Sequence, residues 1–207
     1  MATGPAATSI TITHTAAGSN RYAVVCFMVK TNDTATSVTY DTVAMTQVNK
    51  EDNLGNDSFV YMYALAAPST TAGANVVGNS SASVALTISC TTYTGAQQTT
   101  PVDAQADLYE TATGSRTVSV TTVADNCWLV CTHTATSANP DAAVNGTLRT
   151  LNLTTLNIID SNAALTPAGA FTIGFNWPSE DQHTISALSI APAAVAAAAN
   201  NWLLMGV

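Results

Sequence analysis

Charged residues are scarce in this sequence. They make up 9% of the 207 residues, and the formal net charge is −8, whereas about 25% charged residues is usual for a soluble domain. The few basic residues are scattered along the chain: Arg21, Lys30, Lys50, Arg116 and Arg149. Because no basic stripe is available to neutralise phosphates, we expect no nucleic-acid partner. A weakly charged surface also repels other copies weakly, which favours association with neighbours.

Long apolar runs are missing as well. No stretch approaches the roughly 20 apolar residues of a membrane-spanning helix, and no basic start followed by an apolar segment marks a secretory signal. We therefore expect no membrane partner. Hydrophobic residues nevertheless make up 47% of the chain, which is enough to build the core of one domain.

Catalytic motifs are absent too. The sequence has no GxSxG elbow, no Walker loop and no dinucleotide fingerprint. The three histidines, His14, His133 and His183, have no helical spacing to another zinc ligand. The adjacent acids Glu51-Asp52 and Glu180-Asp181 would point to opposite faces of a strand, so we interpret them as solvated turns. We expect a protein that is not an enzyme and that uses no metal and no other cofactor.

One loop leaves calcium open as an alternative. The segment Asn49–Ser58 (NKEDNLGNDS) is rich in oxygen ligands and contains Gly55, and calcium often holds such loops in place. Its spacing matches no EF-hand. We favour a plain hairpin loop.

The four cysteines, Cys26, Cys90, Cys127 and Cys131, lie inside apolar, strand-like runs. On one strand, Cys127 and Cys131 would be about 13 Å apart along the chain, too far for a disulfide with each other. We interpret all four as small buried hydrophobic side chains. A disulfide between neighbouring strands and, less favoured, a metal site are the alternatives.

Threonine and alternating polarity dominate what is present. Threonine makes up about one residue in six and suits a half-exposed strand face. Period-two alternation predicts strands at Ser9–His14, Arg21–Lys30, Ser37–Asp41, Val43–Val48, Ser58–Ala66, Ala74–Gly78, Ser83–Thr94, Arg116–Val123, Cys127–Ala135, Gly146–Leu151, Phe171–Trp177 and Thr184–Ala191. Such a series predicts an all-β fold: a single, jelly-roll-like β-sandwich over residues 1–192, with no internal repeat.

Two segments break this pattern. Thr94–Ser115 reads as a long polar connection, and long connections in compact domains usually cover a surface or serve a function. Residues 193–207 form an apolar C-terminal arm, whose assembly residues are Trp202, Leu203, Leu204 and Met205. Left in water, these side chains would cost several kcal/mol at roughly 25 cal/mol per Å². We expect the arm to pack on a neighbouring subunit, with folding back onto its own domain and membrane contact as the less favoured alternatives.

Aromatic residues suggest a sugar-binding alternative. Sugars usually stack on exposed Trp or Tyr side chains beside polar groups. Trp177, at a strand end before Pro178, and Tyr109, in the polar connection, are the candidate ligand-binding residues. Trp128 has apolar neighbours, so we expect it in the core.

Several motifs resemble those of a family of uncharacterised Thr-rich β-sandwich proteins from tailed phages and environmental bacteria. They are His14-Thr15 with Gly18–Arg21 leading into YAVVCFMV, VTYDTVAMTQV at Val38–Val48, YMYALAAP at Tyr61–Pro68, YTGAQQTTPVDA at Tyr93–Ala104 and TISALSIA at Thr184–Ala191. This resemblance implies a virion-surface or adhesive role and brings no catalytic residues. The chain departs from the family in having Asp41-Thr42 where Asn-Gly is usual, and in the arm after Pro192.

The function we expect is that of a non-enzymatic virion structural protein, either a capsid decoration or a fibre-type protein. It would sit in the virion as a homo-oligomer, with copies of itself and the major capsid protein or another virion protein as partners. Two alternatives stay open. One is a carbohydrate-binding or host-adhesion module for surface glycans. The other is an extracellular filament subunit that completes the next subunit with its arm or an edge strand.

Overall fold

The computed structural model describes residues 1–30, 34–52, 58–135, 140, 142–152 and 156–194. These residues form thirteen strands and no helix. The strands are β1 (Ala2–His14), β2 (Tyr22–Lys30), β3 (Ala35–Tyr40), β4 (Val43–Ala44), β5 (Thr46–Asp52), β6 (Ser58–Ala66), β7 (Ala74–Tyr93), β8 (Val102–Thr121), β9 (Trp128–Ala135), β10 (Ala142–Val144), β11 (Thr147–Asn152), β12 (Leu156–Asp160) and β13 (Ala170–Ile190). The all-β class and the sandwich architecture are therefore confirmed.

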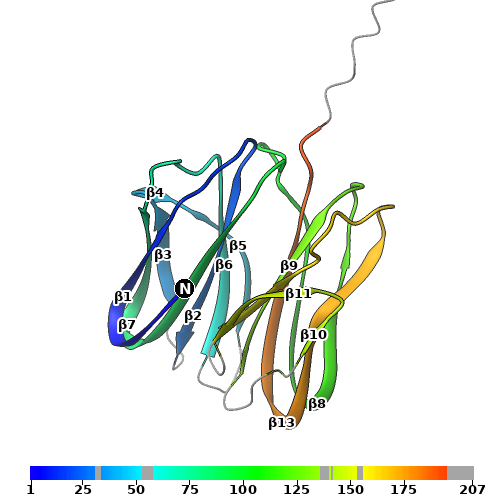
Figure 1. Cartoon of the computed structure of the whole chain (residues 1–207). Coiled ribbons are helices and arrows are strands. Elements are labelled where there is room, and N and C mark those ends of the chain that lie inside the picture. Colours follow the sequence, from blue (N-terminus) through cyan, green and yellow to red (C-terminus); the bar gives the residue numbers. More distant parts are fainter. Residues whose placement is uncertain (31–33, 53–57, 136–139, 141, 153–155, 195–207) are drawn as a thin grey trace, which may run out of the picture.

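The sequence halves divide cleanly between two antiparallel sheets, which lie side by side (Figure 1). The first sheet contains β1 to β7 and the second contains β8 to β13. The described chain thus passes between the sheets once, after β7. In a jelly roll, by contrast, the strands of each sheet come from both halves of the chain, so the finer jelly-roll connectivity differs from the strand order found here.

The two sheets repeat the same strand arrangement. In the first, β7 pairs with β1 along one edge and with β3 and then β2 along the other, and β2 continues to β6 and β5. In the second, β13 pairs with β8 along one edge and with β10 and then β9 along the other, and β9 continues to β12 and β11. This internal repeat corrects the expectation that the chain has none.

The repeat extends to the residue register. Val24 pairs with Ala64 in the first sheet, and Val130 pairs with Asp160 in the second. The pairing of β5 with β6 shifts between Gln47 and Asn49, and the pairing of β11 with β12 shifts between Leu148 and Thr150. Each half therefore carries a β-bulge at the equivalent place, Val48 in the first half and Arg149 in the second.

Few identical residues mark this repeat. Thr87-Ile88-Ser89 and Thr184-Ile185-Ser186 occupy equivalent places on β7 and β13, beside β2 and β9. Asn20 and Asn126 precede β2 and β9 and both have positive φ, at 48° and 63°. Asparagine tolerates that conformation better than most residues, which explains why both turns use it.

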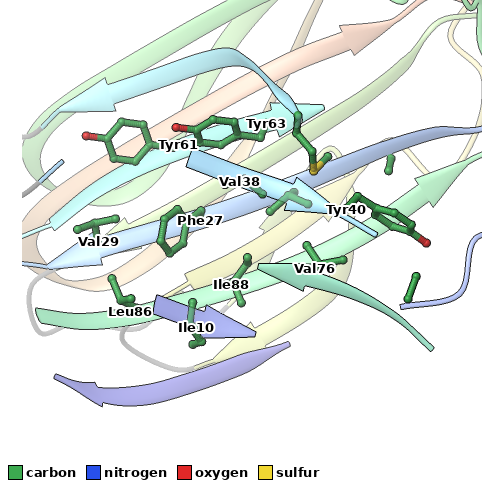
Figure 2. Packing of buried hydrophobic residues seen from close by; sticks show 14 of the residues in the cluster. Ile10, Phe27, Val29, Val38, Tyr40, Tyr61, Tyr63, Val76, Leu86 and Ile88 are labelled. Atoms are coloured by element: carbon green, nitrogen blue, oxygen red, sulfur yellow. The ribbon is translucent and has the colours of Figure 1, made fainter. Parts of the chain in front are cut away.

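Alternate residues of the central strands face different cores. On β2, Val24 and Cys26 face the central core between the two sheets, whereas Val25 and Phe27 face an outer core that β1, β3 and the first part of β7 close (Figure 2). On β9, Val130 faces the central core, and its neighbours Leu129 and Cys131 face a second outer core that β8 and β13 close. β2 is thus apolar on both faces, and β9 carries buried side chains on both faces, because each strand separates two cores.

The outer cores fill equivalent space with different side chains. Gly78 leaves room for Phe27 in the first, because a Cβ atom there would lie 3.0 Å from the ring and the ring would have to shift. The equivalent positions in the second half carry Phe175 and His133, whose ring centroids are 5.1 Å apart. The two halves share the strand register but place the aromatic rings at different positions. This is expected because a core tolerates such exchanges as long as its total side-chain volume is kept.

One long segment differs from its expected structure. Thr94–Ser115 reads as a polar connection, yet β8 begins at Val102 and occupies most of it. Ala104, Ala106 and Leu108 pack against the outer core, and the residues between them point the other way. These small apolar residues satisfy the alternation of a strand but give a weak hydrophobic signal. Only residues 94–101 connect β7 to β8.

Candidate binding grooves at the seam between the two sheets

Trp177 is more deeply buried than expected, and Trp128 is less deeply buried. Trp177 is 1% exposed and stacks on His183, with ring centroids 3.9 Å apart. The expectation that it is an accessible sugar platform is therefore wrong, because β13 continues past it and turns it into the outer core. Trp128, expected in the core, does pack against the central core, but it is only half-buried and also lines two surface hollows.

Tyr109 does not join Trp177 in one site. It lies half-buried on β8, opposite Thr184 of β13. Its neighbour Leu108 packs in the same outer core as Trp177. Because successive residues of a strand point to opposite faces, Tyr109 lies on the other face of the sheet.

The remaining candidates fall partly outside the described residues. The assembly residues Trp202, Leu203, Leu204 and Met205 lie outside them, as do residues 53–57 of the calcium alternative. Asn49, at the start of that loop, is buried and donates from Nδ2 to the carbonyl oxygen of Ala187 at 3.0 Å. It ties β5 to β13. In the part of the chain that the structure describes, no three His, Cys, Asp or Glu residues are grouped to hold a metal ion.

All four cysteines are free thiols. Cys26, Cys127 and Cys131 are buried, which confirms the interpretation for these three, and Cys90 is half-buried. Burial raises the pKa of Cys26 and of Cys90 to about 12. The thiolate is the reactive form of cysteine, so these two side chains are inert near neutral pH.

Two grooves open at equivalent places of the two halves. The first groove, about 510 Å³, is lined by Tyr22, Thr46, Val48, Ala64, Leu65, Ala66, Gln98, Thr99, Thr100, Pro101 and Val102. We call it the apolar groove because none of these residues is charged, although Thr46 and Gln98 to Thr100 are polar. The polar groove, about 350 Å³, is lined by Thr91, Thr92, Tyr93, Thr94, Trp128, Arg149 and Asp160.

The strand register relates the two grooves residue by residue. Tyr22 corresponds to Trp128, since they pair with equivalent positions of β7 and β13. The bulge residue Val48 corresponds to Arg149, and Ala64 corresponds to Asp160. Three apolar or aromatic side chains in the first half are thus replaced by a Trp and an ion pair in the second.

The ion pair of the polar groove has two-point geometry. Arg149 donates to Asp160 from Nε at 2.7 Å and from Nη2 at 2.8 Å, and Nη2 also donates to Oδ1 of Asn162 at 2.6 Å. The Asp160 side chain is 3% exposed and that of Arg149 is 35% exposed. Because β-bulges redirect side chains, the bulge explains how Arg149 reaches a carboxylate on the neighbouring strand.

Further donors complete the carboxylate shell. The backbone N–H of Asn162 donates to Oδ1 of Asp160 at 2.8 Å, and the Tyr93 hydroxyl donates to Oδ2 at 3.3 Å. Burial, followed by the charge of Asp160, raises the pKa of Tyr93 well above its ordinary value, so the phenol keeps its proton. Hydrogen bonds to Asp160 raise the pKa of Arg149. The Tyr93 phenol and the Arg149 guanidinium therefore both keep their protons around neutral pH.

The aromatic part of the polar groove comes from both sheets. Trp128 starts β9, and Tyr93 ends β7 on the other sheet, with their ring centroids 5.9 Å apart. The Tyr93 hydroxyl carries a hydrogen bond across the seam to Asp160 of β12. The groove therefore combines a partly accessible indole, a fixed guanidinium and the threonines Thr91 and Thr94.

No protein-family model, curated protein or solved structure matches this chain. The resemblance to Thr-rich phage and bacterial β-sandwiches stays a prediction. Within the described residues, no helix is long and apolar enough to cross a membrane.

Proposed function

We propose that this chain is a non-enzymatic structural protein whose copies assemble by placing the C-terminal arm of one copy in the apolar groove of the next. The observation that carries this proposal is the apolar groove itself. Its wall contains the apolar side chains Val48, Leu65 and Val102 together with uncharged polar residues, and none of the described residues that line it carries a charge. The arm supplies matching chemistry in Trp202 to Met205, which carry no charge either.

The last described residues support a neighbouring copy as the occupant. Ala191 donates from its N–H to the carbonyl oxygen of Pro101, in the groove wall, at 2.8 Å. Two residues later Ala193 donates to the carbonyl oxygen of Gly95 at 2.7 Å. The chain thus passes the wall and continues away from it before residue 195. A second copy receives such an arm without a reversal of the chain, as in domain-swapped assemblies.

The setting we favour is a phage virion, with this protein as a capsid decoration or fibre-type subunit. The resemblance of its motifs to Thr-rich virion proteins and its low charge support that setting. The partners are then copies of itself and the major capsid protein or another virion protein. Burying a Trp or Leu side chain contributes about 1.5–3 kcal/mol, and four such residues offset part of the entropic cost of association.

The test compares the full chain with two variants by sedimentation. Deleting Asn200–Val207 removes the occupant, and Val48→Arg places a charge in the groove. The second half carries Arg149 at the same bulge, so this backbone accommodates the substitution. Leu148→Arg, at an exposed position outside both grooves, is the matched control.

We expect the full chain and Leu148→Arg to form the same oligomer, and the deletion and Val48→Arg to be monomers with unchanged β circular dichroism. A labelled peptide of residues 193–207 should bind the deletion variant and lose that binding in a variant that also carries Val48→Arg. A full chain that is monomeric, or an oligomer that survives both changes, overturns the proposal. Polymers that lengthen with concentration would favour the filament subunit over a closed assembly.

A further inference from the structure

We propose that the polar groove is a binding site for a neutral sugar, which stacks on Trp128 and accepts hydrogen bonds from Arg149. This site is separate from the apolar groove and does not depend on assembly. It lies at the seam of the two sheets, with walls from β7, β9, β11 and β12.

Comparison of the two halves shows that the fold does not need the ion pair. The first half builds the same register and the same bulge with Val48 and Ala64 where the second has Arg149 and Asp160. A buried carboxylate pays a desolvation penalty that an ion pair offsets only with excellent geometry. Two apolar residues avoid this penalty at the seam, and the first half has them. The presence of the Arg149–Asp160 pair is therefore better explained by ligand binding than by stabilisation of the fold.

The arrangement of the pair selects the kind of ligand. Asp160 accepts hydrogen bonds from Arg149, Asn162 and Tyr93, so its oxygens are already occupied. The contacts of Arg149 use Nε and Nη2, and the planar guanidinium then directs Nη1 to the opposite side. The groove thus offers fixed donors, and a ligand there must bring acceptor oxygens.

Charge balance favours hydroxyl oxygens over anions. Asp160 neutralises Arg149 at 2.7 Å, and the whole chain carries a net charge of −8. A phosphate or sulfate group would meet no net positive charge in the groove. A neutral hydroxyl group accepts from Nη1 and donates to a threonine without that cost.

The indole and the threonines complete a sugar-shaped site. Trp128 is half-buried and backed by Tyr93, so its ring is held in place while part of it stays accessible. An aromatic face of this kind packs against the apolar C–H face of a sugar ring. Thr91, on the same face of β7 as Tyr93, and Thr94 line the rim, whereas the Thr92 hydroxyl is hydrogen-bonded to His14 at 2.8 Å. The volume of about 350 Å³ is at the small end for ligand sites and suits a monosaccharide or a short oligosaccharide.

A neutral-glycan array probed with the labelled full chain tests the site, followed by titration of the best glycan by calorimetry. Trp128→Ala should weaken binding by at least about tenfold, as loss of a stacking platform implies. Arg149→Lys keeps the charge but loses the two-point geometry and should weaken binding by about tenfold as well. Tyr109→Ala, on β8 outside the groove, should leave it unchanged.

Melting curves and circular dichroism establish that each variant is folded. If Trp128→Ala does not fold, Arg149→Lys still tests the site, because it keeps a cation beside Asp160 and so preserves the fold. The deletion of Asn200–Val207 should bind the glycan as tightly as the full chain, so failure of the assembly proposal does not affect this result. An array without neutral-glycan binding overturns the inference. So does binding only to sulfated or phosphorylated glycans, or binding that survives both groove substitutions.

Discussion

Replacing the ion pair of the polar groove by the residues of the first half should leave the fold nearly intact. The double variant Arg149→Val/Asp160→Ala installs the side chains that Val48 and Ala64 place at the equivalent positions. Each single substitution, in contrast, leaves one member of the pair without its partner. Free energies of unfolding should therefore be strongly non-additive.

The magnitude follows from the exposure of each group. Arg149→Val leaves the Asp160 carboxylate, which is 3% exposed, with donors from Asn162 and Tyr93 only. Removing one partner of a fully buried pair costs about 3–5 kcal/mol. Because the Arg149 side chain is 35% exposed, water can enter its place, and we expect a loss of about 2–3 kcal/mol. Asp160→Ala leaves a guanidinium that can turn to solvent, at a cost of about 1–2 kcal/mol.

Urea unfolding followed by circular dichroism at pH 7 measures all four proteins of the cycle. The double variant should lose only about 1 kcal/mol, which gives a coupling free energy of about 2–4 kcal/mol between the two positions. The same double variant should lose glycan binding. A double variant whose loss equals the sum of the single losses would refute the equivalence of the two seams, and with it the reasoning that the pair is retained for a ligand.

Three further outcomes test the fold. Gly174→Ala should destabilise the protein by several kcal/mol in urea unfolding, because the new Cβ would lie 2.7 Å from Cα of Thr117 in the paired strand β8. Gly169→Ala is the control: a Cβ there would meet no atom within 4 Å, so the free energy of unfolding should change by no more than about 1 kcal/mol. Trp177→Ala should cost about 3–5 kcal/mol in the same assay, a loss that an exposed Trp would not give. Cys26 and Cys90 should resist iodoacetamide at pH 8 until urea unfolds the chain. Because burial raises their folded pKa to about 12 from 9.0, the stability they contribute is complete below pH 9.0 and is lost as the pH rises toward 12, which unfolding curves at several pH values will show.

Strand positions were predictable where alternation of polarity is strong. The predicted Ser58–Ala66 is β6 with the same bounds, and Arg21–Lys30 differs from β2 by one residue. The short strand β12 was not predicted, although its side chains are buried. Leu156 and Ile158 face the central core and Ile159 faces an outer core, so apolar side chains lie on both faces and the strand lacks the period-two signal.

The internal repeat was beyond the reach of sequence patterns for a physical reason. Register is set by backbone pairing and by which face is buried, and many side chains satisfy both conditions. Phe27 and His133 occupy one pair of equivalent positions, and Ser80 and Trp177 another. Such replacements preserve the sheet while removing sequence similarity, so the repeat is visible in pairings and not in residues.

The burial of Trp128 and of Trp177 also differs from what local sequence indicates. Trp177 stands between Asn176 and Pro178, which favours an exposed strand end, whereas Trp128 stands between Cys127 and Leu129, which favours the core. What separates them is the strand end: Trp128 opens β9 at the seam, where the sheets part, and Trp177 lies inside the 21-residue strand β13. One signal did point to the polar groove. In a chain with five basic residues, an Arg in a strand-rich segment is a position where a specific partner is expected.

Differences between equivalent positions of the two halves separate packing from function. In the outer cores, the exchange of Leu86 for His183 lies among buried rings, and its consequences stay inside the protein. At the seam, the exchange of Val48 for Arg149 changes the chemistry of a groove open to solvent. Because both halves have the same fold, the requirement for stability is similar at the two grooves. We therefore attribute the difference in their chemistry to the different ligands that they bind. The apolar groove then binds an apolar segment and the polar groove binds a hydroxylated ligand, which accounts for the lining of both grooves.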